Sequence, residues 1–288
     1  MATLVGGIGS SHAPSIAFAY DAGHQDRPEW KAYFEAWAPV RAWLRAVRAD
    51  TVVAVYNDHL NRFQFDAYPT FALGLAPMLG VAREGRTPRG LPDVPGDAPF
   101  AWHTAASLVR DEFDPALCQE MTLDHGVMSI LPLLDPPPWS LKVVPIAVNV
   151  ILEPMPTPRR CWRLGEAIAR AIDSFDPDRR VVVLATGGLS HQLHGSDFGF
   201  TNPAWDRRFM DLIEADPQPL VDASHADYIT RGGAESVEMM VWLAMRGALA
   251  QASRETESGS RRLRRVARYY DAPMLTGYGM LTIALESG

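Results

Sequence analysis

Residues 181–195 read VVVLATGGLSHQLHG, and this stretch decides the class of fold. Its first part, Val181–Thr186, is a short apolar run that is rich in β-branched residues and shows no polar alternation. Such a run is typical of a strand that is covered on both faces, as in α/β sheets. Two glycines and then His191 follow within a few residues, so the stretch predicts a buried strand that ends in a polar loop.

Segments on either side of this stretch fit the same kind of sheet. Further buried strands are predicted at Leu4–Ile8, Thr51–Tyr56, Leu141–Val150 and Gly279–Leu285. Helices are predicted from apolar residues near 3.6 spacing at Trp30–Val47, Phe100–Phe113, Arg160–Phe175, Trp205–Ala215 and Gly233–Leu249. Pro39 is expected to kink or split the first of these helices. The alternation predicts an α/β fold, a layered sheet with helices on both faces and the active site at the strand ends.

Composition excludes several classes of protein. The chain has 288 residues, of which 47% are hydrophobic, and its net charge is −7. This mild acidity argues against nucleic-acid binding, which favours a basic face. The one basic cluster, between Arg261 and Arg268, is interpreted as a solvated helix face.

Membrane and secretory signals are also missing from the sequence. No apolar run approaches the roughly 18–20 residues of a membrane-spanning helix, and the N-terminus lacks the basic region of a secretory signal. The two cysteines are too few for a disulfide framework. We therefore expect no membrane partner and a cytoplasmic location, where thiols stay reduced.

Histidines are placed at the ends of predicted strands. His12 follows the predicted strand Leu4–Ile8, His59 follows Thr51–Tyr56 and His191 follows Val181–Thr186. His125 lies ahead of Leu141–Val150. Side chains just past the strand ends of an α/β sheet line its ligand crevice. Imidazoles at such positions need partners, which a metal ion or a substrate would provide. Ordinary loop or surface positions are expected for the remaining histidines, His24, His103, His194 and His225.

Glu238 lies in the strongly periodic segment Gly233–Leu249. In a helix it would share a face with apolar residues three and four positions away. Burying a carboxylate in such a stripe is costly unless it is paired or binds a metal, and the alternative is a rim position with its head in water. Two histidines with one carboxylate form the facial triad of non-heme Fe(II) oxygenases, but the same ligands also serve hydrolytic zinc. Spacing alone leaves both metals open.

Five motifs carry a resemblance to a known family. They are SSHAPS (10–15), VYNDHLNRF (55–63), DHGVM (124–128), TGGLSHQLHG (186–195) and GGAESVEMMVWLAMRGAL (232–249). In this order they resemble the class III extradiol ring-cleavage dioxygenases, in particular the catalytic (beta) subunits of the protocatechuate-cleaving members. The resemblance implies a single catalytic domain over residues 1–288 with one Fe(II) ion. The implied reaction is O2-dependent cleavage of a carboxylated catechol such as protocatechuate to a hydroxymuconic semialdehyde, with gallate or methylgallate as alternative substrates.

Position by position, the resemblance also implies roles for the histidines. His12, His59 and Glu238 match the family's iron ligands. His191 matches its catalytic acid/base, which suits an imidazole because the ordinary pKa of about 6.5 lets it accept and return a proton near neutrality. His125 matches a second active-site histidine that contacts substrate or oxygen.

Three further residues are implied to support the site. Asn57 and Asp58 fall in the family's NDH turn, where Asp58 could orient His59. Thr276 is the candidate for a small hydroxyl beside the substrate carboxylate.

Partners and rival functions complete the expectations. Related protocatechuate enzymes pair such a chain with a small helical alpha subunit that covers the active site, and we expect this lid subunit here. The alternative is a loop of this chain, Phe18–Trp30 or Thr87–Pro99, that serves as lid in a homodimer. The rival functions are a metal-binding homologue without oxygenase activity and a zinc hydrolase.

Overall fold

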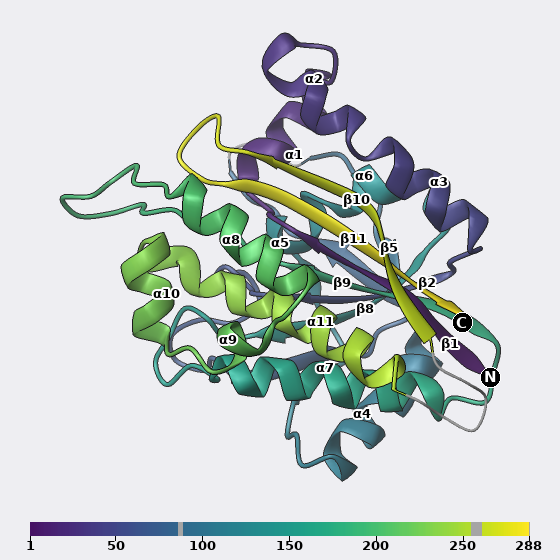
Figure 1. Ribbon diagram of the computed structural model, residues 1–288. Helices are drawn as coiled ribbons and strands as arrows, with labels where there is room; N and C mark the ends of the chain where they lie inside the picture. The colour runs from purple at the N-terminus through teal and green to yellow at the C-terminus, as the bar shows by residue number, and fades with distance from the viewer. Residues whose placement is uncertain (86–88, 255–260, 288) are drawn as a thin grey trace.

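The computed structural model describes residues 1–85, 89–254 and 261–287. The strands are β1 (Ala2–Ser10), β2 (Thr51–Tyr56), β3 (Phe71–Gly74), β4 (Met78–Val81), β5 (Val94–Pro95), β6 (Ala116–Cys118), β7 (Thr122–Leu123), β8 (Lys142–Val148), β9 (Arg179–Thr186), β10 (Arg261–Asp271) and β11 (Tyr278–Ser287). Within these residues they form an eight-stranded sheet of order β10-β11-β1-β9-β2-β8-β3-β6 and a three-stranded sheet of order β5-β4-β7 (Figure 1).

Helices connect most of the strands. They are α1 (Pro14–Asp21), α2 (Pro28–Glu35), α3 (Ala38–Ala46), α4 (Ala98–Arg110), α5 (His125–Met128), α6 (Leu131–Leu134), α7 (Pro158–Asp173), α8 (Pro203–Glu214), α9 (Gln218–Val221), α10 (His225–Gly232), the 3₁₀ helix η1 (Ala234–Val241) and α11 (Trp242–Ala252). In Figure 1, α1, α2, α3 and α6 lie on one side of the large sheet, and α4, α7 and α11 lie on the other. The predicted α/β fold with helices on both faces is confirmed.

Alternate residues of the central strands feed two separate hydrophobic cores. Val53 and Val55 of β2 pack in the core beneath α4, α7 and α11, whereas Val52 and Ala54 pack in the core beneath α1–α3 and α6. A strand buried on both faces needs apolar residues at every position, which is why β2 and β9 show no alternation in the sequence.

The direction of the strands decides where the site forms. Strands β1, β9, β2 and β8 run parallel, and Ser10 at the end of β1 is in register with Thr186 at the end of β9. Strand β11 runs antiparallel to β1 and pairs Met280 with Ser10, so it begins at the edge where the parallel strands end. The segments that follow β1, β2 and β9 therefore meet there, together with the segment that precedes β11.

Pro39 has the expected effect on the first helical segment. That segment is split into α2 and α3, and Pro39 lies in the first turn of α3. A proline is tolerated there because the first N–H groups of a helix have no partner within the helix.

The prediction of an α-helix over Gly233–Leu249 is wrong for the first half of that segment. Residues Ala234–Val241 form the 3₁₀ helix η1, and an α-helix begins only at Trp242. A 3₁₀ helix has three residues per turn, so the α-helical face assigned to Glu238 does not apply.

The interpretation of the arginine cluster as a helix face is also wrong, because these residues lie on β10. Pairing with β11 over the length of β10 makes the segment a strand, although its sequence shows no clear alternation. Three of its arginines contact acidic groups: Arg264 contacts Glu286 at 2.7 Å, Arg265 contacts Glu214 at 3.1 Å and Arg268 contacts Asp211 at 2.6 Å. Arg261 instead donates to the carbonyl of Leu4.

Among the described residues, no helix has the length and apolar character that crossing a membrane requires.

Candidate metal centre

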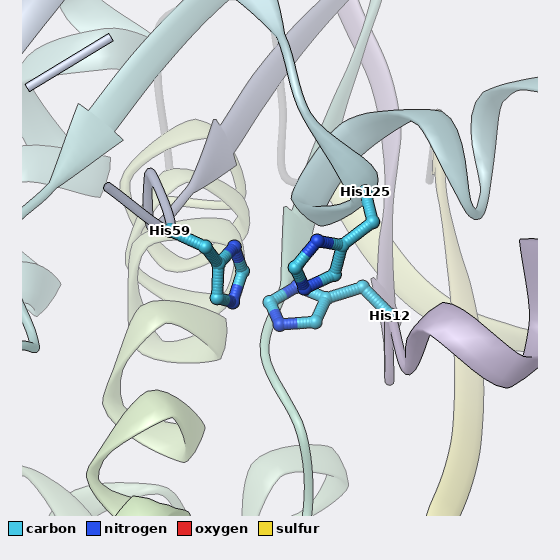
Figure 2. Close-up of side chains that lie close together, drawn as sticks. All are labelled: His12, His59 and His125. Atoms are coloured by element: carbon cyan, nitrogen blue, oxygen red, sulfur yellow. The ribbon is translucent and has the colours of Figure 1, made fainter. Parts of the chain in front are cut away.

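Three histidines meet where the parallel strands end (Figure 2). His12 follows β1, His59 follows β2, and His125 is the first residue of α5. The ring centroids of His12 and His59 are 4.9 Å apart, and those of His59 and His125 are 3.8 Å apart. One ring nitrogen from each of the three lies within 4.8 Å of the others, so the cluster could share one ion.

Glu238 reaches the same point from η1. Its Oε2 lies 3.1 Å from His12 Nε2, and its Oε1 lies 3.5 Å from His59 Nε2. The residue is 8% exposed, so the alternative of a rim position in water is wrong. Two donors hold the carboxylate in place: the Gly188 N–H at 2.7 Å and the Asn57 side-chain amide at 3.0 Å.

Glycines allow the loop after β9 to lie against η1. A Cβ added to Gly187 would lie 2.2 Å from the carbonyl oxygen of Glu238, and one added to Gly233 would lie 2.2 Å from that of His191. Gly233 also has a φ of +95°, a conformation that favours glycine. At Gly188, an added Cβ would meet both the His191 ring at 2.6 Å and Glu238 Oε2 at 3.0 Å. His191 and Glu238 therefore lie close together beside the backbone of Gly188, where there is no room for a side chain.

His59 is oriented by Asp124. The Asp124 carboxylate lies 3.0 Å from His59 Nδ1, and it accepts hydrogen bonds from the backbone N–H of His59 at 2.6 Å and of Gly126 at 2.9 Å. A proton on Nδ1 leaves Nε2 as the atom that faces Glu238. Burial disfavours the charged imidazole, but hydrogen bonds to Asp124 and Glu238 outweigh burial and raise the pKa of His59 to about 10.

Asp58 does not make the contact that the sequence suggested. Its carboxylate accepts hydrogen bonds from the backbone N–H groups of Asn61, Arg62 and Phe63, and so it shapes the turn after His59. Asp58 cannot orient the His59 ring in this way because a carboxylate one residue before His59 points into its own turn. The partner comes from the DHG segment, where the sequence analysis selected only His125.

Asn57, in the same turn, contacts two members of the cluster. Its side-chain amide lies 2.9 Å from His59 Nε2 and 3.0 Å from Glu238 Oε1. Its N–H₂ group therefore helps to hold the Glu238 carboxylate beside His59.

His125 has its own acidic partner, which the sequence analysis missed. Glu84 lies 2.6 Å from His125 Nδ1, and it accepts a second hydrogen bond from the His125 backbone N–H at 2.6 Å. The two residues are 41 positions apart, and Glu84 lies in a segment without a recognisable motif, so no local signal marks this pair.

His191 is held by backbone groups instead of a carboxylate. Its Nδ1 donates to the carbonyl of Leu189 at 2.6 Å, and its N–H donates to the carbonyl of Gly232 at 2.7 Å. This arrangement leaves the Nε2 of a neutral ring free to accept a proton. An isolated β-bridge joins His191 to Thr276, so the hydroxyl candidate from the last hairpin lies beside the candidate base.

These residues fit a divalent cation. Two ligands bound to one ion at about 2.1 Å and at right angles lie about 3 Å apart, which is close to the spacing of Glu238 from His12 and His59. Burial alone would raise the pKa of Glu238, but His12, His59 and His191 hold it well below its usual range. His12 Nδ1 is buried without a hydrogen-bond partner among the described residues. Imidazole and carboxylate ligands without thiolate suit iron or zinc.

Known proteins with similar sequences include two kinds of dioxygenase. Gallate dioxygenase of Pseudomonas putida is 42% identical over 209 residues, which cover 72% of this chain and 58% of that protein. A 2,3-dihydroxyphenylpropionate/2,3-dihydroxicinnamic acid 1,2-dioxygenase of Cupriavidus necator is 29% identical over 256 residues, which cover 74% of this chain and 80% of the relative. The chain thus spans less than two thirds of the length of the first relative and most of the second.

A solved structure and a family description agree with the fold and the motifs. An uncharacterized protein of Escherichia coli K12 superposes with a TM-score of 0.57 at 15% identity, over 97% of this chain and 99% of that chain, which shows a shared fold. Residues 6–272 match the family described as "Catalytic LigB subunit of aromatic ring-opening dioxygenase". The predicted resemblance to class III extradiol enzymes is confirmed, and the chain belongs to the family of catalytic LigB subunits of aromatic ring-opening dioxygenases.

Proposed function

We propose that this chain is an Fe(II)-dependent extradiol dioxygenase, one catalytic domain over residues 1–288, that opens the ring of a carboxylated catechol with O2. Its metal ligands are His12, His59 and Glu238. The observation that carries the proposal is the convergence of these three side chains, with Glu238 at 3.1 and 3.5 Å from the two histidines. Three protein ligands on one face leave positions open for a diol and for O2.

The iron would bind the two adjacent hydroxyls and pass electrons from the ring to O2. The remaining work falls to the protein. His191 accepts the proton of one hydroxyl at Nε2, because its Nδ1 is committed to the Leu189 carbonyl. It then returns that proton as the ring opens. His125, beside His59, directs its free ring nitrogen at the substrate while Glu84 holds Nδ1.

A gallate-type substrate is favoured. The support is the 42% identity to gallate dioxygenase, against 29% to an enzyme named for substrates with longer side chains. Protocatechuate, which has one hydroxyl fewer than gallate, is the second candidate substrate. It is favoured because the motifs of this chain resemble those of protocatechuate-cleaving enzymes. In either case we expect the hydroxyl of Thr276, a residue joined to His191 by a β-bridge, to bind the ring carboxylate.

A small lid subunit is proposed as partner. Exposed apolar side chains flank His191 and Thr276 along the chain, as a surface that a second chain covers would. They are Leu193, Phe198, Phe200, Met274 and Leu275. A lid over this surface would exclude water from the reaction.

The alternative partner is a second copy of this chain. In that homodimer a loop of the chain itself, and not a separate subunit, would cover the active site. The two candidate loops are tied together, since Arg89 of Thr87–Pro99 contacts Asp21 of Phe18–Trp30 at 2.7 Å. Thr87 and Pro88 lie outside the described residues. The free cysteines Cys118 and Cys161 agree with a cytoplasmic location.

Anaerobic metal loading tests the proposal. The chain is loaded with Fe(II) or Zn(II) and then given gallate, methylgallate, protocatechuate or 2,3-dihydroxyphenylpropionate. O2 uptake and the absorbance of the ring-opened product are recorded. We expect activity with iron only and the highest kcat/KM for gallate. Absence of O2 uptake with every diol, with or without an added lid subunit, would support the metal-binding homologue, and hydrolysis with zinc would support the hydrolase.

A further inference from the structure

Asp206 is a buried carboxylate outside the metal centre. It lies in the first turn of α8 and is 0% exposed. Its Oδ1 accepts a hydrogen bond from the Ser190 N–H at 2.8 Å, and its Oδ2 accepts from the Ser190 hydroxyl at 2.7 Å and the Tyr270 hydroxyl at 2.8 Å. These donors are neutral, and among the described residues no cationic side chain donates a hydrogen bond to Asp206. Burying a carboxylate without such a partner is costly. Burial accordingly raises the pKa of Asp206.

The bonds to Asp206 fix the residue that precedes His191. The backbone N–H of Asn202 donates to Ser190 Oγ at 2.7 Å, so the Ser190 hydroxyl proton is free to point at Asp206. The carbonyl of Ser190 accepts from the Gly277 N–H at 3.1 Å. Every polar group of Ser190 is therefore engaged, and its backbone and side chain have one orientation.

Asp206 also joins three segments that meet around His191. It belongs to α8, it binds the loop after β9 through Ser190, and it binds β10 through Tyr270. The hairpin after β10 packs directly on it, since a Cβ added to Gly277 would lie 2.3 Å from Asp206 Oδ2.

We infer that Asp206 is a positioning residue for His191, an inference that rests on the proposed function of His191 as acid/base. By fixing Ser190, Asp206 holds the short turn in which His191 Nδ1 donates to the Leu189 carbonyl, and so it keeps Nε2 directed at the substrate. Replacement of the carboxylate by an amide puts an N–H₂ group where an acceptor is needed. The turn would then relax and the imidazole would lose its fixed direction.

Asp206→Asn tests the inference through kinetics. We expect kcat to fall about 10- to 100-fold, the loss typical of a misplaced reacting group, while KM for the diol and iron content stay unchanged. Asp211→Asn is the matched control, because it makes the same chemical change on the same helix at an exposed position, and it should be neutral. Tyr270→Phe removes one donor and should give a smaller loss in the same direction.

A double-mutant cycle separates positioning from a general structural role. In a His191→Phe background, Asp206→Asn should cause no further fall in kcat, since the group it positions is gone. A further loss of the same size as in the wild type would overturn the inference.

Nitrogen NMR of the histidine rings gives a readout that does not depend on turnover. The wild type should show His191 with its proton on Nδ1, and both Asp206→Asn and Tyr270→Phe should give a mixture of ring tautomers. Unchanged His191 signals in Tyr270→Phe and in folded Asp206→Asn would contradict the inference. A normal wild-type spectrum without any O2 uptake would instead contradict the proposed function.

Discussion

Two histidine–carboxylate pairs lie side by side in this molecule, and they are built at different depths. Asp124 holds His59 with a side chain that is 0% exposed, whereas Glu84 holds His125 with a side chain that is 31% exposed. Asp124 and His125 are consecutive in the chain, yet each belongs to a different pair. In the buried pair His59 follows β2 of the large sheet and Asp124 follows β7 of the small sheet, whereas the half-exposed pair depends on a segment between β4 and β5.

The difference agrees with the two roles proposed above, His59 as a metal ligand and His125 as a histidine that meets substrate. A metal ligand needs one ring orientation at all times, which a buried carboxylate with several bonds secures. A histidine that meets substrate must tolerate its arrival and departure, and a partner open to water allows the pair to adjust. Substitutions in the two pairs and at the neighbouring site residues test this division of roles. Their expected effects range from loss of the metal to a small fall in kcat.

Removal of a metal ligand should have the largest effect. His12→Ala, His59→Ala and Glu238→Ala should each lose stoichiometric iron and all activity while circular dichroism shows the fold retained. The reason is that each variant leaves only two of the three proposed ligands. Metal analysis after anaerobic loading and O2 uptake measure the outcome.

His125→Ala is the matched comparison, because its ring nitrogen lies close enough to the cluster to compete for the same ion. It should keep iron. Stoichiometric iron in Glu238→Ala together with iron loss in His125→Ala would replace the proposed ligand set by the three histidines.

His191→Phe should keep its iron but lose turnover by about 10²–10⁴-fold, the range for loss of a general acid/base. His191 is held by a backbone carbonyl and not by a carboxylate, so it belongs to neither pair. Its kcat and its iron content are measured on the same sample. If iron disappears with the ring, His191 is a ligand and the assignment of the other histidines fails.

Asp124→Asn should weaken metal binding by about 10- to 100-fold, since the amide no longer fixes the His59 tautomer. Competition with a chelator of known affinity measures the change. Asp58→Asn is the control, because the Asp58 carboxylate accepts hydrogen bonds from the turn backbone next to the same histidine. Equal losses in the two variants would mean that the turn, and not Asp124, orients His59.

Glu84→Gln should have the smallest effect. We expect unchanged metal affinity and a fall in kcat of less than about tenfold, since one net hydrogen bond contributes about 0.5–1.5 kcal/mol. Chelator competition and steady-state kinetics provide the two readouts. A loss of metal as large as in Asp124→Asn would end the distinction between the two pairs.

The sequence predicted the sheet well because its central strands are buried on both faces. Thr51–Tyr56 was predicted with the bounds that β2 has, and the strands that carry the histidines follow the same logic.

Contacts between distant segments could not be predicted in the same way. Glu84 and Asp206 act on residues 41 and 16 positions away, and neither lies in a motif. The 3₁₀ helix η1 packs against the loop after β9, a contact that the periodicity of its own sequence does not show. The arginines of β10 read as a helix face because a strand partner near the chain's last residues leaves no trace in their own pattern.

The charged strand β10 has a consequence for association. It is the last strand in the order of the large sheet, and such a strand offers backbone N–H and C=O groups to any other extended chain. Its arginines, paired with Glu214, Asp211 and Glu286, place a row of charge along that border. A strand of a second copy could pair with β10 and continue the sheet only if these charged side chains lost part of their hydration. The border therefore resists aggregation by strand addition.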